Sequence, residues 1–155
     1  MTQQDKDEGG VSPLAEATGY AGLLPFLGAL LGVGLLPTFE QRDLAQRLAL
    51  GYGATILSFV GAVHWGAAML HARMNEGDRA VFMTWSVVPA LVAWAALLMP
   101  AKTGLLLMAA TFAAHYGADR QFAQRFALPS WYLRLRAGLS AVVIICLLLA
   151  ILRVE

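Results

Sequence analysis

The stretch Leu48–Ala72, LALGYGATILSFVGAVHWGAAMLHA, decides the fold class. Its 25 residues include no Lys, Arg, Asp or Glu, and a helix needs about 20 consecutive apolar residues to cross a bilayer. The pattern therefore predicts an all-α membrane protein with five transmembrane helices. Four further uncharged stretches have the same character: Ala17–Phe39, Ala80–Ala101, Thr103–Ala118 and Ala137–Leu152.

The composition supports this class. Of the 155 residues, 59% are hydrophobic and only 14% are charged, whereas about 25% are charged in an average soluble domain. This excludes an ordinary soluble globule and a disordered chain. The net charge of +1 gives no field that would attract nucleic acid, and one cysteine, Cys146, cannot form an internal disulfide.

We expect a single membrane domain over residues 17–155, after a disordered acidic tail over residues 1–16. Ser12-Pro13 is typical of a helix start. Phe122 and Phe126 stand one turn apart, which predicts a short interfacial helix over Asp119–Ala127. The five predicted spans cover about 20–36, 48–70, 81–99, 103–118 and 133–152.

The distribution of Lys and Arg predicts the orientation. The N-terminal tail and the links on its side carry seven of them, against four on the other side. The positive-inside rule then places the N-terminus in the cytoplasm and the C-terminus outside. The first 19 residues are acidic, unlike a secretory signal or a mitochondrial presequence, which favours a bacterial inner membrane.

The first four spans resemble two copies of one helical hairpin. The second and fourth spans both end in His-aromatic-Gly-Ala, at His64–Ala67 and at His115–Ala118. The pattern indicates either a tandem duplication or a chance likeness between apolar spans. Both interpretations place the two histidines at the same depth, near the inner face.

Small residues recur at helical spacing inside the spans, and helices in lipid associate through such residues. We therefore expect tight contacts between helices. The stripes are Gly28 and Gly32 in the first span, Ala54, Ser58, Ala62 and Gly66 in the second, and Ala109, Ala113 and Gly117 in the fourth.

A group of polar and aromatic residues near the inner face is the first candidate for function, because polar groups inside a membrane are costly. They could hold helices in register, form a proton or ion path in which Asp119 fixes the tautomer of His115, or ligate a haem through His64 and His115. Too few ligands are present for a metal site, and we expect no metal and no cofactor. The group consists of His64, Trp65, Trp85, His115 and Asp119.

A second candidate is a basic and aromatic region before the last span. It would contact anionic lipid head groups or an acidic loop of a partner, or serve only as a topology signal. No acidic residue lies inside a predicted span and no nucleophile motif is present, which disfavours an enzyme. The region contains Arg120, Arg125, Trp131, Tyr132, Arg134 and Arg136.

Three sequence blocks carry a family resemblance. They are Tyr52–Phe59 followed by Gly61–Gly66, Trp85–Leu91, and Pro129–Tyr132 with the following Leu-Arg-Leu-Arg. Over about residues 20–152, the chain resembles a family of small multi-span membrane proteins that share a domain of unknown function and are similar to transmembrane protein 69. The resemblance implies a bacterial or mitochondrial inner membrane and no established activity. It defines no catalytic residues.

The sequence thus favours a non-catalytic structural or assembly partner of a membrane complex. The alternative is a small transporter or proton-coupled carrier that uses His64 and His115, and a haem-binding redox subunit is third. The expected partners are the lipid bilayer and a membrane protein or a second copy of the chain, with no nucleic acid.

Overall fold

The computed structural model describes residues 12–72, 74–126 and 130–152. Within these ranges the chain is helical and has no strand, which confirms the all-α class. The predicted acidic tail falls largely on residues 1–11, outside this description, but residues 13–16 are helical. The six helices are α1 (Pro13–Ala21), α2 (Leu24–Leu35), α3 (Phe39–Leu70), α4 (Glu76–Leu97), α5 (Ala101–Phe126) and α6 (Ser130–Ile151).

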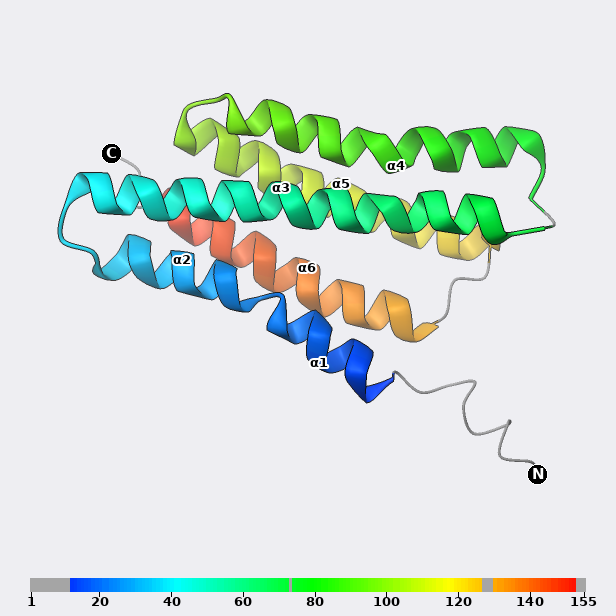
Figure 1. The fold of residues 1–155 in the computed structure, drawn as a ribbon, viewed down its shortest axis with the longest axis horizontal. Coiled ribbons are helices and arrows are strands. Elements are labelled where there is room, and N and C mark those ends of the chain that lie inside the picture. Colours follow the sequence, from blue (N-terminus) through cyan, green and yellow to red (C-terminus); the bar gives the residue numbers. More distant parts are fainter. Residues whose placement is uncertain (1–11, 73, 127–129, 153–155) are drawn as a thin grey trace.

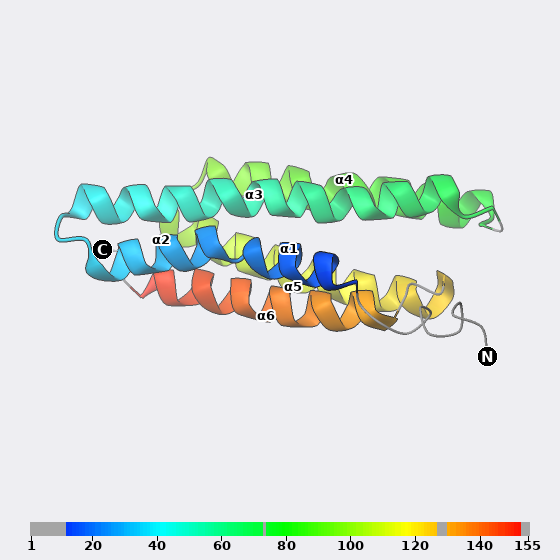
Figure 2. The ribbon, with the colours of Figure 1, turned by 60° about the horizontal axis from the view of Figure 1, so that its bottom comes forward.

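The helices form an elongated bundle of five rods, because α1 and α2 together make the first one (Figures 1 and 2). Successive rods run antiparallel. The first rod and α6 start at the same end of the bundle, and α6 finishes at the opposite end, as five crossings require (Figure 1). We call the end where α1 and α6 start the polar end and the other the apolar end.

The first rod is broken at Gly22 and Leu23, just before Pro25 in the first turn of α2. Proline removes a backbone donor and clashes with the preceding turn, so the carbonyls before it lose their helical partners. Tyr52 of α3 donates its hydroxyl hydrogen to the Gly22 carbonyl at 3.0 Å. A neighbouring helix thus satisfies a backbone group that lipid could not.

Pro89 does not break α4, which continues through it. At this level α3 and α4 come close together, because a Cβ added at Gly61 would collide with the backbone oxygen of Ser86. A second close approach lies at the apolar end, where a Cβ at Gly104 would stand 2.6 Å from the Ala96 oxygen. These glycines allow the tight helix contacts that the sequence predicts.

On α3, Gly61, which stands beside the predicted stripe, makes the close contact, and most of the stripe itself does not. Gly53 and Gly61 face inward, whereas Ser58 and Ala62 are exposed and nothing lies within 4 Å of a Cβ built at Gly66. The stripes differ because the bundle packs on only one side of α3. We call the uncovered stripe the outer face of α3; it consists of Gly51, Thr55, Ser58, Ala62 and Gly66.

The predicted interfacial helix over Asp119–Ala127 is not separate, because α5 runs without a break to Phe126. Ala127 lies outside the described residues. By length and hydropathy, four described segments are suited to cross a membrane: Pro13–Leu35, Phe39–Leu70, Glu76–Leu97 and Trp131–Ile151. Polar residues lower the hydropathy of α5, and two of them, His115 and Asp119, are buried inside the bundle.

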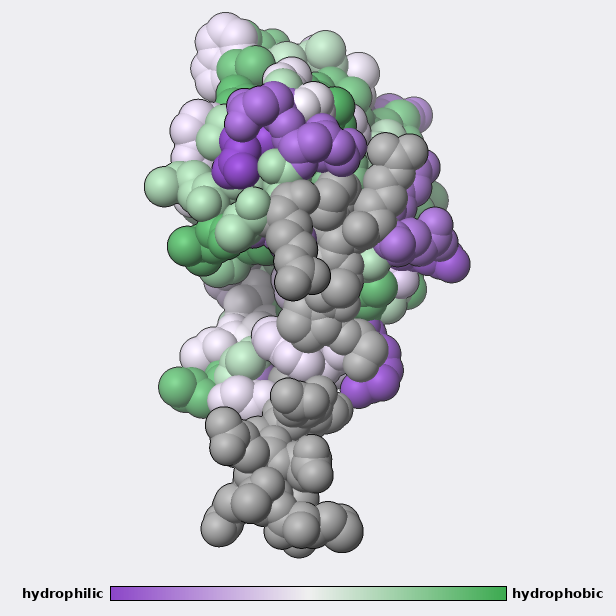
Figure 3. Space-filling view, turned by 90° about the vertical axis from the view of Figure 1, so that its right-hand side faces the viewer, coloured by the Kyte–Doolittle hydropathy of each residue, from purple (hydrophilic) through white to green (hydrophobic). Residues whose placement is uncertain are grey.

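Hydrophilic side chains gather at the polar end of the bundle (Figure 3). Here Asn75 caps α4 by accepting a hydrogen bond from the Asp78 amide at 2.8 Å. Arg79 donates to the Ala68 carbonyl, which satisfies the C-terminal turn of α3. The link between α3 and α4 is thus fixed by its own polar side chains.

Candidate functional site

Asp119 of α5 is the centre of a buried polar cluster and is completely inaccessible to solvent. One carboxylate oxygen accepts a hydrogen bond from Nε of Arg136 on α6 at 3.0 Å. The other lies 3.2 Å from Nε2 of His64 on α3. Three helices therefore meet at one carboxylate. Asp119 directly follows the uncharged stretch Thr103–Ala118, and α5 continues past that stretch to Phe126.

His115 lies one turn before Asp119 on α5 and is also fully buried. Its Nδ1 accepts a hydrogen bond from Nε1 of Trp85 on α4 at 3.1 Å. Since Nδ1 is the acceptor, the ring is neutral and its proton is on Nε2. The expected partner of Asp119 was His115, whereas in the structure Trp85 fixes the His115 tautomer and Asp119 lies beside His64.

The polar cluster, defined as His64, Trp85, His115, Asp119 and Arg136, is thus built by all four helices from α3 to α6. The two histidine rings are in edge contact, with 5.0 Å between their centroids. Phe82 and Phe122 cover His64, at centroid distances of 5.7 and 5.0 Å. These two rings lie 4.1 Å apart and close the cluster towards the polar end.

All members of the polar cluster lie at one level of the bundle. Towards the apolar end, the described core consists of apolar side chains such as Leu57, Leu105 and Met108. Gln46, near the apolar end, donates to the Ala150 carbonyl at 3.3 Å. The polar cluster therefore links α3, α4, α5 and α6 at one level of the bundle.

The chemistry of the donors favours hydrogen bonding over metal binding. Potential ligand atoms of His64, His115 and Asp119 lie within 4.8 Å of one another. However, Trp85 uses one ring nitrogen of His115 and a proton occupies the other, and Arg136 already neutralises Asp119. The direct contact between the two histidine rings also leaves no space for a haem between them.

Comparison with known proteins agrees with the resemblance found in the sequence. Residues 11–152 match a family described as a protein of unknown function, DUF3429. The chain belongs to the DUF3429 family. It is 36% identical over 133 residues to transmembrane protein 69 of Xenopus tropicalis, a match that covers 83% of this chain. The chain spans half the length of that relative. No solved structure matches it.

This DUF3429 chain is therefore a multi-pass membrane protein, and its structure locates each residue of the first candidate group. His64, Trp85, His115 and Asp119 meet in the polar cluster. Trp65 does not join them, because it lies on the outside of α3 and is 45% exposed.

The basic and aromatic region of this DUF3429 chain divides into two sets. Arg120 and Arg134 are exposed, as contact with head groups requires. Arg136 differs from that expectation, because it is only 5% exposed and is paired with Asp119. Trp131 and Tyr132 are half-buried and line a cavity. The side chain of Arg125 lies outside the described residues.

Sequence reasoning missed two features of the site. Arg136 was grouped with its neighbours because four arginines and two aromatic residues stand close together in sequence. The signal that separates it is helical spacing: Tyr132, Arg136 and Ser140 follow each other at intervals of four and therefore share one face of α6. The covering rings of Phe82 and Phe122 come from distant helices and have no sequence signal.

Proposed function

We propose that this chain is a non-catalytic assembly partner of another membrane protein, and that the two associate through the outer face of α3. The observation that carries the proposal is this face itself, five small residues at successive turns that no described helix covers. Helices in lipid associate through small residues because their backbones can then approach closely.

The outer face of α3 has the properties of such a contact surface. A Cβ built at Gly51 or Gly66 meets nothing within 4 Å. The hydroxyl groups of Thr55 and Ser58 donate to carbonyls of their own helix, at 2.8 Å to Tyr52 and 2.8 Å to Ala54. The face therefore presents no unsatisfied polar group and can pack against an apolar helix.

The polar cluster supports the same role. It is buried and joins four helices, so it serves to hold the helices in register, as in the first of the three interpretations of the sequence. A rigid bundle presents α3 in a fixed position, as an interface requires. We further propose a bacterial inner membrane, with the polar end and the N-terminus on the cytoplasmic side.

The test is purification from native membranes in a mild detergent with bulky substitutions on the outer face of α3. Gly51→Leu and Gly66→Leu should abolish recovery of a stoichiometric partner protein. Gly28→Leu on α2 is the matched control, because that glycine also has nothing within 4 Å and should leave recovery unchanged. Recovery of the chain alone, or only as a complex with its own copies, would overturn the proposal.

The second candidate is a proton-coupled carrier that uses His64 and His115. The observation in its favour is that Arg136 belongs both to the polar cluster and to the wall of a cavity. Flux of a substrate or proton in proteoliposomes should then fall in a His64→Ala/His115→Ala double variant. Flux that the double variant leaves unchanged would dismiss this role.

A further inference from the structure

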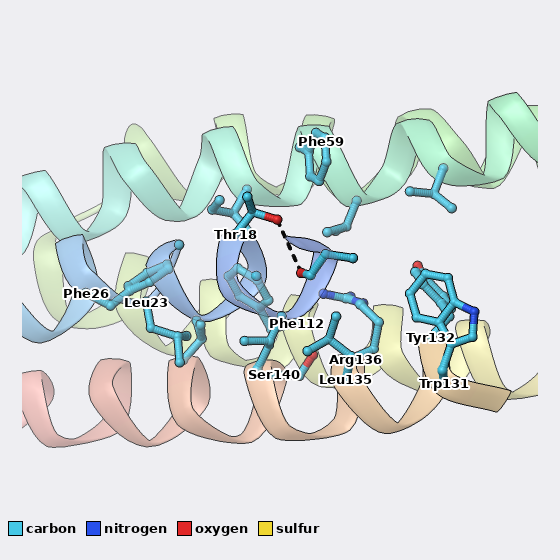
Figure 4. Close-up of a pocket in the computed structure, with 18 residues that line it drawn as sticks. Thr18, Leu23, Phe26, Phe59, Phe112, Trp131, Tyr132, Leu135, Arg136 and Ser140 are labelled. Atoms are coloured by element: carbon cyan, nitrogen blue, oxygen red, sulfur yellow. Dashed lines mark hydrogen bonds between the residues drawn. The ribbon is translucent and has the colours of Figure 1, made fainter. Parts of the chain in front are cut away.

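A cavity of about 370 Å³ lies between the first rod, α3, α5 and α6. Its volume is in the range of small-molecule sites, about 300–1,000 Å³. Most of its wall is apolar, including Phe26, Val60, Phe112, Leu139 and Val143. Figure 4 shows these elements around the cavity, with side chains of α6 extending into the space below α3.

One part of the wall is polar, and it comes from a single face of α6. Tyr132, Arg136 and Ser140 line the cavity at successive turns. The Tyr132 hydroxyl, Nη2 of Arg136 and the Ser140 hydroxyl are all buried and have no hydrogen-bond partner among the residues that the structure describes. Arg136 and Ser140 are 5% and 3% exposed. Buried polar atoms are nearly always paired in proteins, so three unpaired groups in one cavity wall indicate a missing acceptor.

The charge of the wall limits the kind of acceptor. Nε of Arg136 is paired with Asp119, which cancels the guanidinium charge and leaves Nη2 as a hydrogen-bond donor. An anionic group in the cavity would add a second negative charge close to Asp119. An uncharged oxygen acceptor, such as a ketone or ester carbonyl, would accept these hydrogen bonds without that cost.

The opening of the cavity indicates where a ligand would come from. Two residues of the wall are exposed, Thr18 of α1 and Phe59 of α3, and Phe59 has an exposed fraction of 71%. The cavity therefore opens between α1 and α3. Both helices belong to segments suited to cross the membrane, so the opening faces lipid.

We propose that this cavity binds one lipid-phase molecule with an uncharged carbonyl group at one end and an apolar body. The carbonyl oxygen accepts hydrogen bonds from Arg136, Tyr132 and Ser140, and the apolar body lies against Phe26, Phe112 and Val143. The proposal is independent of the partner that binds the outer face of α3, which lies on another side of the same helix.

The experiment uses the full chain in lipid nanodiscs and a monoacylglycerol that carries a photoreactive diazirine in its acyl chain. Peptide mapping should locate the label on residues of the cavity wall. Excess unlabelled monoacylglycerol or a prenylated benzoquinone should compete, and the stronger competitor identifies an ester or a ketone as the natural head group. Hexadecane, which has no acceptor, should not compete.

Two variants test the cavity: a double variant removes polar groups from its wall, and a single variant fills its volume. The double variant Tyr132→Phe/Ser140→Ala removes two unpaired hydroxyl groups, so it should fold as well as the natural chain but bind the probe roughly tenfold more weakly. Val143→Phe should block labelling by filling the cavity. Leu149→Phe, on the lipid-facing side of the same helix, is the matched control and should bind normally.

The proposal has clear ways to fail. Labels spread over the lipid-facing surface, or competition by hexadecane equal to that of monoacylglycerol, would show that there is no specific site. Unchanged affinity in Tyr132→Phe/Ser140→Ala would overturn the role of the polar wall. Oleate competing more strongly than monoacylglycerol would overturn the choice of an uncharged head group.

Discussion

The two ends of the bundle are held together by different physical means. At the polar end, polar side chains of α3, α5 and α6 meet at Asp119, and aromatic rings cover them. At the apolar end, small residues let the helix backbones approach closely, as at Gly104 and Ala96. There Gln46 of α3 donates a hydrogen bond to the Ala150 carbonyl of α6 at 3.3 Å.

The comparison shows what each kind of packing tolerates. An apolar contact loses energy in proportion to the atoms removed or the overlap introduced. A buried ion pair is different, because removal of one partner leaves the other charge unpaired in a medium without water. The polar end should therefore respond more steeply to single substitutions than the apolar end.

The largest expected effect is at Asp119. Asp119→Asn removes the negative charge while Arg136 stays buried, so the free energy of unfolding should fall by about 3–5 kcal/mol. Unfolding in mixed micelles with increasing SDS measures this. Asp43→Asn is the matched control, because Asp43 pairs with Arg47 at 2.7 Å on the surface and such pairs contribute roughly 0.5 kcal/mol. Equal losses in the two variants would remove the distinction between the buried and the exposed pair.

The next effect tests the close approach of helices. Gly61→Ala places a methyl group against the Ser86 backbone oxygen, and overpacking of this kind costs about 1–3 kcal/mol. Gly51→Ala on the same helix meets nothing within 4 Å and should be neutral or stabilising by up to about 1 kcal/mol. The same SDS titration compares the two, and destabilisation by Gly51→Ala to the same degree would contradict the packing described here.

A smaller effect is expected at Trp85. Trp85→Phe keeps the apolar ring but removes the donor to His115, which should cost about 1 kcal/mol. Trp94→Phe is the control, because Trp94 is exposed to lipid and has no such contact. If both variants are equally stable, the Trp85–His115 hydrogen bond does not contribute to the polar cluster.

The smallest effect should be at Gln46, a buried polar residue near the apolar end. Gln46→Leu removes its hydrogen bond to the Ala150 carbonyl but adds apolar contact, so the net change should stay within about 1 kcal/mol. A loss as large as that of Asp119→Asn, measured in the same titration, would show that the two ends do not differ in the way proposed.

Much of the fold could be predicted from the sequence. The runs without charge identify the membrane-spanning rods, because lipid excludes charged side chains from exposed positions. The rule fails at Asp119, since it cannot separate a charge outside the membrane from a charge that is buried and paired. For the same reason the uncharged stretch predicts a helix shorter than α5, and the sequence places Arg136 among the head groups.

The site was predicted in part. The matching endings at His64 and His115 indicate a common depth, and the two rings do meet. Which face of α3 packs inward could not be read from the sequence, because two stripes of small residues run along that helix. The partners of each side chain depend on how the helices are rotated, and that rotation follows from the packing of all five rods.

The most direct test of the account is a double-mutant cycle between Asp119 and Arg136. The cycle combines Asp119→Asn, Arg136→Met and the double variant in the SDS titration. If the two side chains form the pair that joins α5 and α6, the double variant should recover part of the loss, with a coupling energy of roughly 2–3 kcal/mol. A coupling energy near zero would mean that the two residues act separately, and it would contradict the central claim that a buried ion pair holds the polar end together.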